Sequence, residues 1–309
     1  MARLLSQNMF DVNGRTVLIM GGGSGIGRML AKGFSVNGAN TVFVDIDENF
    51  LLEAKKEAED LAKTVGVDAK VHTIKGDLSS KEGVQAVIAN FLQTHATLDT
   101  IIHRAAYRHM NVIPFKHGES LETLQTATSS ASWDLWSHAF QLNVLAPYFL
   151  TAGLITLLGD AARKGDGRGS VILFSSPASV HNHQFVPAYQ TSKAAVDHLT
   201  RIIAAEFADF YRAYTYLSLL FSMIVELTYV VRVNAISPGI VPSGMSDVND
   251  PASNLHLAKE SPARRAGGED MAGTAIWLSS KAGSFMDGEI VRIDGGRLLV
   301  LKGVISHHD

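Results

Sequence analysis

The chain has 309 residues, of which 46% are hydrophobic and 18% are charged, so it is long and apolar enough for one large folded domain. A net charge of −3, without a Lys/Arg-rich run, argues against a nucleic-acid or anionic-membrane surface as partner. Because the sequence has no cysteine, disulfides and thiolate metal sites are excluded, and a reducing, cytoplasmic location is expected.

Short apolar runs alternate with amphipathic stretches along most of the chain. We expect strands at Thr16–Met20, Asn40–Asp45, Ala69–Ile74, Leu98–Ile102, Ser170–Phe174, Val231–Ile236 and Glu289–Ile293. We expect helices at Gly25–Asn37, Asn49–Lys63, Ser80–Thr94, Ala131–Leu158, Asp270–Ser280 and from Pro187 onward, with Ser79 or Ser80 capping the third. The pattern predicts a single α/β domain over 1–309: a doubly wound parallel sheet of about seven strands with helices on both faces.

A glycine-rich turn separates the first expected strand from the first helix. Gly21, Gly25 and Gly27 allow a tight turn and let a pyrophosphate approach backbone N–H groups at a helix N-terminus. An acid, Asp45, closes the second strand 18 residues after Gly27. A carboxylate there accepts hydrogen bonds from a ribose diol and repels a 2′-phosphate, so the sequence predicts a dinucleotide site with NAD favoured over NADP.

Tyr189 and Lys193 are spaced i, i+4, which places them on one face of the helix that begins at Pro187. A Lys ammonium beside a phenol favours the phenolate, so Tyr189 is a candidate general acid or base. Ser175 and Ser176 end the strand before this helix, where a hydroxyl could polarise a carbonyl or orient an alcohol. Two histidines in His181–His183 could suggest a metal pair, but i, i+2 spacing without further ligands predicts no metal site.

These motifs resemble the short-chain dehydrogenase/reductase family over nearly the whole chain. The family's T-G-x-x-x-G-x-G turn matches Met20–Gly27, with Met20 in place of Thr, and its Y-x-x-x-K matches Tyr189–Lys193. Its serine, 13 residues before the tyrosine, falls on Ser176. Further matches are Asn143 for the helix asparagine, Asp77 for the adenine-side acid, Pro238-Gly239 with Ser243 for the turn after the sixth strand, and Ile293–Gly296 for the closing V-D-G-G.

The resemblance implies a Rossmann-like NAD(P)-dependent oxidoreductase that interconverts a ketone and a secondary alcohol. It implies that Tyr189 passes the proton, Ser176 positions the oxygen, Lys193 holds the nicotinamide ribose, and Asn143 supports a water relay. Implied cofactor contacts are Gly21, Gly25, Ile26, Gly27, Asp45, Asp77, Asn143, Tyr189, Lys193, Pro238, Gly239, Ile240 and Ser243. The implied partner is a small carbonyl or ketoacyl substrate, of secondary metabolism, and the implied assembly is a homodimer or homotetramer.

One departure from the family affects the turn after the fourth strand. The family's N-N-A-G is here His103-Arg104-Ala105-Ala106, and the Gly-rich strand that this turn contacts carries Met20. A compensating repack and weaker cofactor binding both fit this change. Arg104 could also meet a 2′-phosphate, which keeps NADP open as the cofactor.

A second departure is an apolar segment of roughly twenty residues, at about 211–231, between the helix of Tyr189 and the sixth strand. We weigh three origins for it: a translated, unspliced intron, a partner-binding helix, or a membrane anchor that would have to bury Glu226. Because it connects a helix to the start of a strand, we expect it at the sheet edge opposite the site. The alternative function is a non-catalytic or misfolded isoform, in which this insertion and the altered turn abolish cofactor binding.

Overall fold

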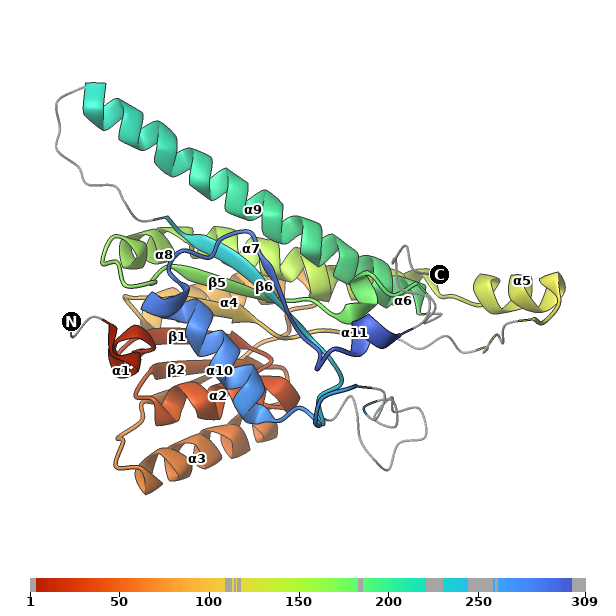
Figure 1. Cartoon of the computed structure of the whole chain (residues 1–309), viewed down its shortest axis with the longest axis horizontal. Coiled ribbons are helices and arrows are strands. Elements are labelled where there is room, and N and C mark those ends of the chain that lie inside the picture. Colours follow the sequence, from red (N-terminus) through yellow and green to blue (C-terminus); the bar gives the residue numbers. More distant parts are fainter. Residues whose placement is uncertain are drawn as a thin grey trace.

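The fold is built on one parallel sheet with the strand order β3-β2-β1-β4-β5-β6-β7 (Figure 1). The computed structural model describes residues 4–108, 113, 115, 118–182, 186–220, 230–243, 258 and 261–301. The strands are β1 (Thr16–Met20), β2 (Asn40–Asp45), β3 (Val71–Lys75), β4 (Thr100–His103), β5 (Ser170–Phe174), β6 (Arg232–Pro238) and β7 (Ile290–Ile293). The predicted doubly wound α/β class and its seven strands are therefore confirmed.

Helices connect these strands and cover both faces of the sheet (Figure 1). They are α1 (Ser6–Met9), α2 (Gly25–Val36), α3 (Glu48–Thr64), α4 (Lys81–Thr94), α5 (Leu121–Ser129), α6 (Trp133–Phe140), α7 (Ala146–Gly153), α8 (Ile155–Ala162), α9 (Pro187–Leu220), α10 (Gly268–Ser279) and α11 (Arg297–Val300). The third predicted helix begins as expected, because the Ser80 hydroxyl accepts a hydrogen bond from the N–H of Gly83 at 3.1 Å.

The core has two halves because successive side chains of a strand point to opposite faces. In β1, Val17 and Ile19 join the half that includes residues of α2, α3 and α10, whereas Leu18 and Met20 join the half that includes residues of α4, α7 and α9. Every residue of β1, β4 and β5 is buried. This burial explains why these strands are apolar throughout rather than alternating.

The prediction of one long helix at Ala131–Leu158 is wrong, because the segment is bent and divided. It consists of α6, a π-helical turn η2 (Gln141–Leu145), α7 and α8, and it bends by 62° at Leu154. A Cβ at Gly153, the last residue of α7, would press on the side chain of Ile88, so α7 approaches α4 closely just before the bend. The strands β3 and β4 also begin two residues later than the apolar runs suggested, because they follow the hydrogen-bond register of their neighbours.

Helix α9 extends well past the end expected for it from the family pattern. It continues to Leu220, so the first ten positions of the predicted insertion are helical, and Figure 1 shows this end projecting away from the sheet, on the side where β6 begins. Residues 221–229 lie outside the described part of the chain. Val231, at the far end of the predicted insertion, is fully buried in the core just before β6.

Within the described residues, no one helix combines the length and apolarity needed to span a membrane. The bent pair Trp133–Gly153 and Ile155–Ala162 meets that criterion by length and composition alone. Three leucines of this pair, Leu150, Leu154 and Leu158, are buried in the core. Residues 221–229 of the predicted insertion lie outside the described part, so its membrane-anchor origin stays a prediction.

Candidate functional site

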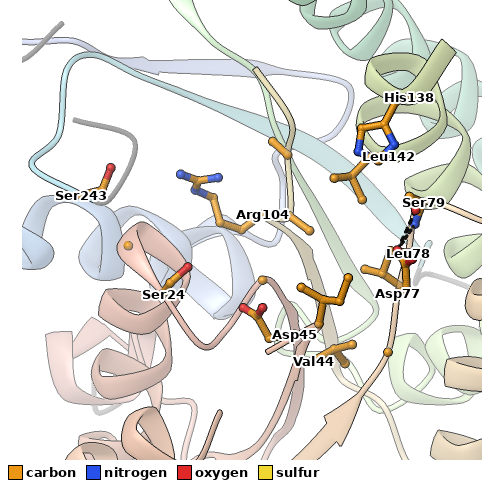
Figure 2. A pocket seen from close by; sticks show the side chains of 16 residues that line it. Ser24, Val44, Asp45, Asp77, Leu78, Ser79, Arg104, His138, Leu142 and Ser243 are labelled. Atoms are coloured by element: carbon orange, nitrogen blue, oxygen red, sulfur yellow. Dashed lines mark hydrogen bonds between the residues drawn. The ribbon is translucent and has the colours of Figure 1, made fainter. Parts of the chain in front are cut away.

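A crevice opens at the carboxyl edge of the sheet, where β1 and β4 lie side by side and their following turns diverge. A cavity of about 420 Å³, here called the large cavity, lies in this crevice. Figure 2 shows Ser24 and Ser243 on one side of it and Asp77, Ser79 and His138 on the other. Its lining includes five predicted residues: Gly21, Gly25, Asp45, Asp77 and Ser243.

The Gly-rich turn forms one wall of the large cavity, and its glycines are required by the backbone. Gly21 and Gly25 have φ angles of +74° and +50°, a region that other residues rarely adopt. A Cβ on Gly27 would collide with the carbonyl oxygen of Gly21, so Gly27 packs behind the turn and does not line the cavity. The turn therefore presents bare backbone at the start of α2.

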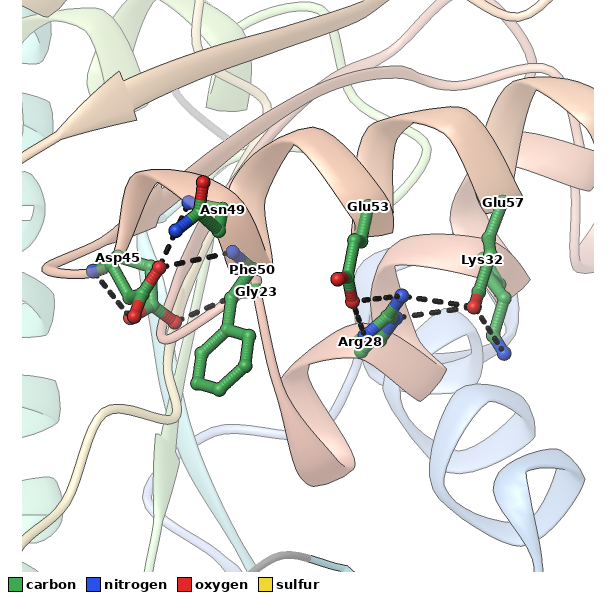
Figure 3. Close-up of polar contacts among 9 residues, drawn as sticks. Gly23, Arg28, Lys32, Asp45, Asn49, Phe50, Glu53 and Glu57 are labelled. Carbon is green, nitrogen blue, oxygen red and sulfur yellow. Dashed lines mark hydrogen bonds and ion pairs between the residues drawn. The ribbon is translucent and has the colours of Figure 1, made fainter.

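Two acids hold the ends of loops around the large cavity. Asp45 accepts a hydrogen bond from the N–H of Gly23 at 3.1 Å, which ties the end of β2 to the Gly-rich turn (Figure 3). Asp77 accepts hydrogen bonds from the hydroxyl and the N–H of Ser79 at 2.7 and 2.9 Å, and these bonds lower the pKa of its carboxyl. Both carboxylates are thus held in place by hydrogen bonds from the backbone.

The altered turn after β4 keeps its connection to the Gly-rich strand. The N–H groups of Arg104 and Ala105 both donate to the carbonyl oxygen of Met20, at 3.1 and 2.9 Å. His103 is buried, its Nε2 lies 2.9 Å from the Thr151 hydroxyl, and burial lowers its pKa to about 3. The backbone contact survives both substitutions, so the turn is repacked with an uncharged imidazole beneath it.

A second cavity of about 90 Å³, here called the small cavity, contains the predicted proton-transfer residues. Lys193 is buried, its Nζ donates to the carbonyl oxygen of Phe174 at 2.7 Å, and it lies 5.6 Å from the centroid of the Tyr189 ring. Burial and then repulsion by Arg104 lower the pKa of Lys193 to about 7. The predicted residues in this lining are Ile26, Ser176, Tyr189, Lys193, Pro238, Gly239, Ile240 and Ser243.

Ser176 lies where β5 ends and the 3₁₀ turn η3 (Pro177–Ser179) begins. Its hydroxyl accepts a hydrogen bond from the N–H of Ala178 at 3.2 Å and lines the small cavity. An oxygen held as an acceptor keeps its own hydrogen available to donate to a ligand. The end of β5 and the first turn of α9 therefore bring Ser176 and Tyr189 to one cavity.

Asn143 lines neither cavity and instead holds neighbouring elements together. It lies in the π-helical turn η2, a feature that often marks functional sites. Its side chain accepts from the N–H of Tyr107 at 2.8 Å and donates to the carbonyl oxygen of Tyr107 and the hydroxyl of Ser192, both at 2.9 Å. Asn143 thus joins the loop after β4 to the helix that carries Lys193.

Arg104 is the residue whose position the motifs did not predict. It lines both cavities, and its guanidinium carbon lies 5.8 Å from the centroid of the Phe174 ring. In Figure 2 the guanidinium points toward the side of the large cavity that carries Ser243. Only the departure from N-N-A-G could have drawn attention to it. Arg108 and Arg297 also line the small cavity, and no sequence motif singled them out.

One prediction concerns a segment that is only partly described. His183 lies outside the described residues, so the expected absence of a metal site at His181–His183 stays a prediction. Among the residues that the structure does describe, no group of three or more His, Cys, Asp or Glu side chains could hold a metal ion.

The two cavities share Arg104, Ala106 and Ser243, so they adjoin along the crevice. The large one offers a bare glycine turn at a helix N-terminus and a carboxylate at the end of β2, which fit a pyrophosphate and a ribose diol. The small one offers a phenol, a hydroxyl and a lysine, which fit a reacting ring and its proton donor. The residues present thus fit an extended nicotinamide dinucleotide.

Comparison with known proteins gives the same family along nearly the whole chain. A family model described as short chain dehydrogenase matches residues 15–211, and one described as Enoyl-(Acyl carrier protein) reductase matches residues 225–297. The short-chain dehydrogenase/reductase PhomF of Diaporthe leptostromiformis is 28% identical over 311 residues, with 96% of each chain covered.

Two comparisons concern Pseudomonas aeruginosa. Its rhamnolipids biosynthesis 3-oxoacyl-acyl-carrier-protein reductase is 28% identical over 292 residues, covering 93% of this chain and 97% of that protein. The solved RhlG/NADP active-site complex superposes with a TM-score of 0.70 at 28% identity, covering 94% of this chain and 98% of that one. The chain therefore belongs to the short-chain dehydrogenase/reductase family and is an oxidoreductase that uses NAD or NADP.

Proposed function

We propose that this enzyme reduces a ketone to a secondary alcohol, or catalyses the reverse oxidation, in the small cavity. The observation that carries the proposal is the presence of Ser176, Tyr189 and Lys193 in the lining of one cavity of about 90 Å³. Turnover of ketones with NADH, followed through the absorbance of the reduced nicotinamide, tests it. Absence of turnover with every ketone offered, despite tight NADH binding, would contradict it.

Each of the three residues has a separate task. Tyr189 exchanges a proton with the substrate oxygen, and Lys193, whose Nζ lies 5.6 Å from the centroid of the Tyr189 ring, is the cation beside it. The Ser176 hydroxyl donates to the same substrate oxygen and fixes its position. Lys193 holds the nicotinamide ribose, and the cofactor supplies the hydride.

Asn143 acts at a distance from the reacting atoms. Its three hydrogen bonds to Tyr107 and Ser192 fix the start of α9 against the loop after β4, so it positions Tyr189 and Lys193. Its role in a water relay to bulk solvent belongs to the same proposal. Asn143 is therefore a positioning residue in this chain, and the relay depends on that geometry.

The proposed substrate class is a small carbonyl or ketoacyl compound, of the kind handled in secondary metabolism. One relative is named a 3-oxoacyl-acyl-carrier-protein reductase, which supports the ketoacyl part of this assignment. The same name places that relative in rhamnolipid biosynthesis. A non-catalytic isoform has less support, because the altered turn keeps its backbone bonds to Met20.

We propose that NAD is the preferred cofactor, so NADH should bind at least about tenfold more tightly than NADPH in a fluorescence titration. The Asp45 carboxylate lines the large cavity where a 2′-phosphate would add further negative charge. The basic residues of α2 do not offset it, because Arg28 and Lys32 form ion pairs with Glu53 and Glu57 of α3 (Figure 3).

The variant Asp45→Asn should bring the two dissociation constants closer by about tenfold, since it removes the charge but keeps an oxygen for the N–H of Gly23. Asp47→Asn is the matched control, because Asp47 caps α3 nearby without lining either cavity. Tighter binding of NADPH than of NADH by the unaltered chain would contradict the proposed preference.

We also propose that the enzyme is a cytoplasmic homodimer or homotetramer. The absence of cysteine is compatible with a reducing compartment. Leu145, Tyr148 and Phe149 expose 47, 38 and 54% of their surface beside α9, whose Ile202 is 39% exposed, and such a patch favours association. Light scattering should give two or four times 33.3 kDa. A mass of one chain at micromolar concentration would contradict the assembly.

A further inference from the structure

The small cavity carries far more positive charge than proton transfer from a phenol requires. Lys193, Arg104, Arg108 and Arg297 all line it, and of its described lining residues none is Asp or Glu. Lys193 alone serves the reaction proposed above. Arg104 needs an explanation of its own, because a charge in a cleft costs free energy unless something compensates it.

Arg104 shows this cost most clearly. Its Nε is buried and has no hydrogen-bond partner among the described residues, and its guanidinium lies over the apolar ring of Phe174. Burial lowers the pKa of Arg104, and Arg104 in turn lowers the pKa of Lys193. A guanidinium in this position is destabilising until an anion meets it.

We infer that the substrate carries an anionic group, a carboxylate or a phosphate, and that Arg104 binds it beside the reacting carbonyl. The inference rests on the proposed function, because it names the substrate class of that same cavity. Arg104 shares the small cavity with Ser176 and Tyr189, so the anionic group lies within one side chain's reach of the reacting oxygen. A planar guanidinium binds such a group through two parallel N–H bonds.

The pyrophosphate of the cofactor is the competing anion, since Arg104 also lines the large cavity. That pyrophosphate already has donors, because the Gly-rich turn presents bare backbone N–H groups at the start of α2. The electrostatic contacts of Arg104 are instead with Tyr189 and Lys193. We therefore favour the anionic group of the substrate as the partner of Arg104. The experiment below also tests the pyrophosphate of the cofactor as its partner.

The test uses acetate and acetamide, which match in size and differ in charge. The chain saturated with NADH is titrated with each, following nicotinamide fluorescence, at an ionic strength held by a bulky sulfonate buffer. We expect acetate to bind at least about tenfold more tightly than acetamide. Arg104→Asn should abolish this preference, Arg104→Lys should keep part of it, and Arg292→Asn, the same change at an exposed arginine, should leave it intact.

Equal binding of acetate and acetamide by the unaltered chain would overturn the inference. So would an Arg104→Asn variant that keeps the acetate preference but binds NADH about tenfold more weakly, because Arg104 would then serve the pyrophosphate. Neither readout needs turnover. Tyr189→Phe should abolish ketone reduction and leave the acetate preference unchanged, so failure of the proposed reaction and failure of anion recognition give different results.

Discussion

Replacing Tyr189 with phenylalanine is expected to lower kcat/KM for ketone reduction by about 10²- to 10⁴-fold, because the variant has no proton to exchange with the substrate oxygen. The ring itself stays, and with it the packing beside Lys193, whose Nζ lies 5.6 Å from the ring centroid. NADH should therefore bind with a dissociation constant within about twofold of the unaltered value. The measurements are steady-state NADH oxidation and a fluorescence titration.

The matched control is Tyr148→Phe, the same loss of a hydroxyl on α7 at a residue that lines neither cavity. It should leave kcat/KM unchanged. A Tyr189→Phe variant with full activity would mean that another group moves the proton, and the assigned mechanism would be wrong. Loss of both activity and NADH binding would point instead to a disturbed start of α9.

The strands of the sheet could be predicted because each is marked by a short run of apolar residues in the sequence. Strands such as β1 and β5 are continuous apolar runs, and only burial on both faces of a parallel sheet explains five such residues in a row. The bend at Leu154 could not be predicted in this way. It lies next to Gly153, which packs closely against Ile88, and no local motif indicates this contact between residues far apart in the sequence.

The candidate site also combines features set by the local sequence with features set by long-range packing. The Gly-rich turn and the Tyr189/Lys193 pair were predictable, since each is a short motif whose spacing fixes its geometry. Arg104 was noticed as a departure from the family, but where its guanidinium points depends on the packing of Phe174 and on the cavity around it. Asn143 was expected to support a water relay, and this role stays a prediction; its bonds to Tyr107 and Ser192 depend on tertiary packing that the motif does not reveal.

Lys193 should be required for activity and unfavourable for stability, a combination that Lys193→Met can separate. We expect this variant to lower kcat/KM by at least about 10²-fold, because the cation beside Tyr189 is lost. In the ligand-free chain it should also remove the cost of a buried ammonium. Chemical denaturation should then show a variant that is less active and, at neutral pH, more stable.

The pH dependence of that stability difference gives the sharper test. In the folded chain the pKa of Lys193 is lowered to about 7, whereas the unfolded chain keeps this lysine protonated up to about its ordinary value of 10.5. Between these values the unfolded state binds more protons, so the unaltered chain gains stability as the pH rises. The advantage of Lys193→Met should shrink by about 2 kcal/mol between pH 7 and pH 9 and level off below about pH 6. Lys70→Met, the same change at an exposed lysine, is the control. An advantage that stays constant over this range would mean that Lys193 remains protonated in the fold, and burial would then not be what sets its charge.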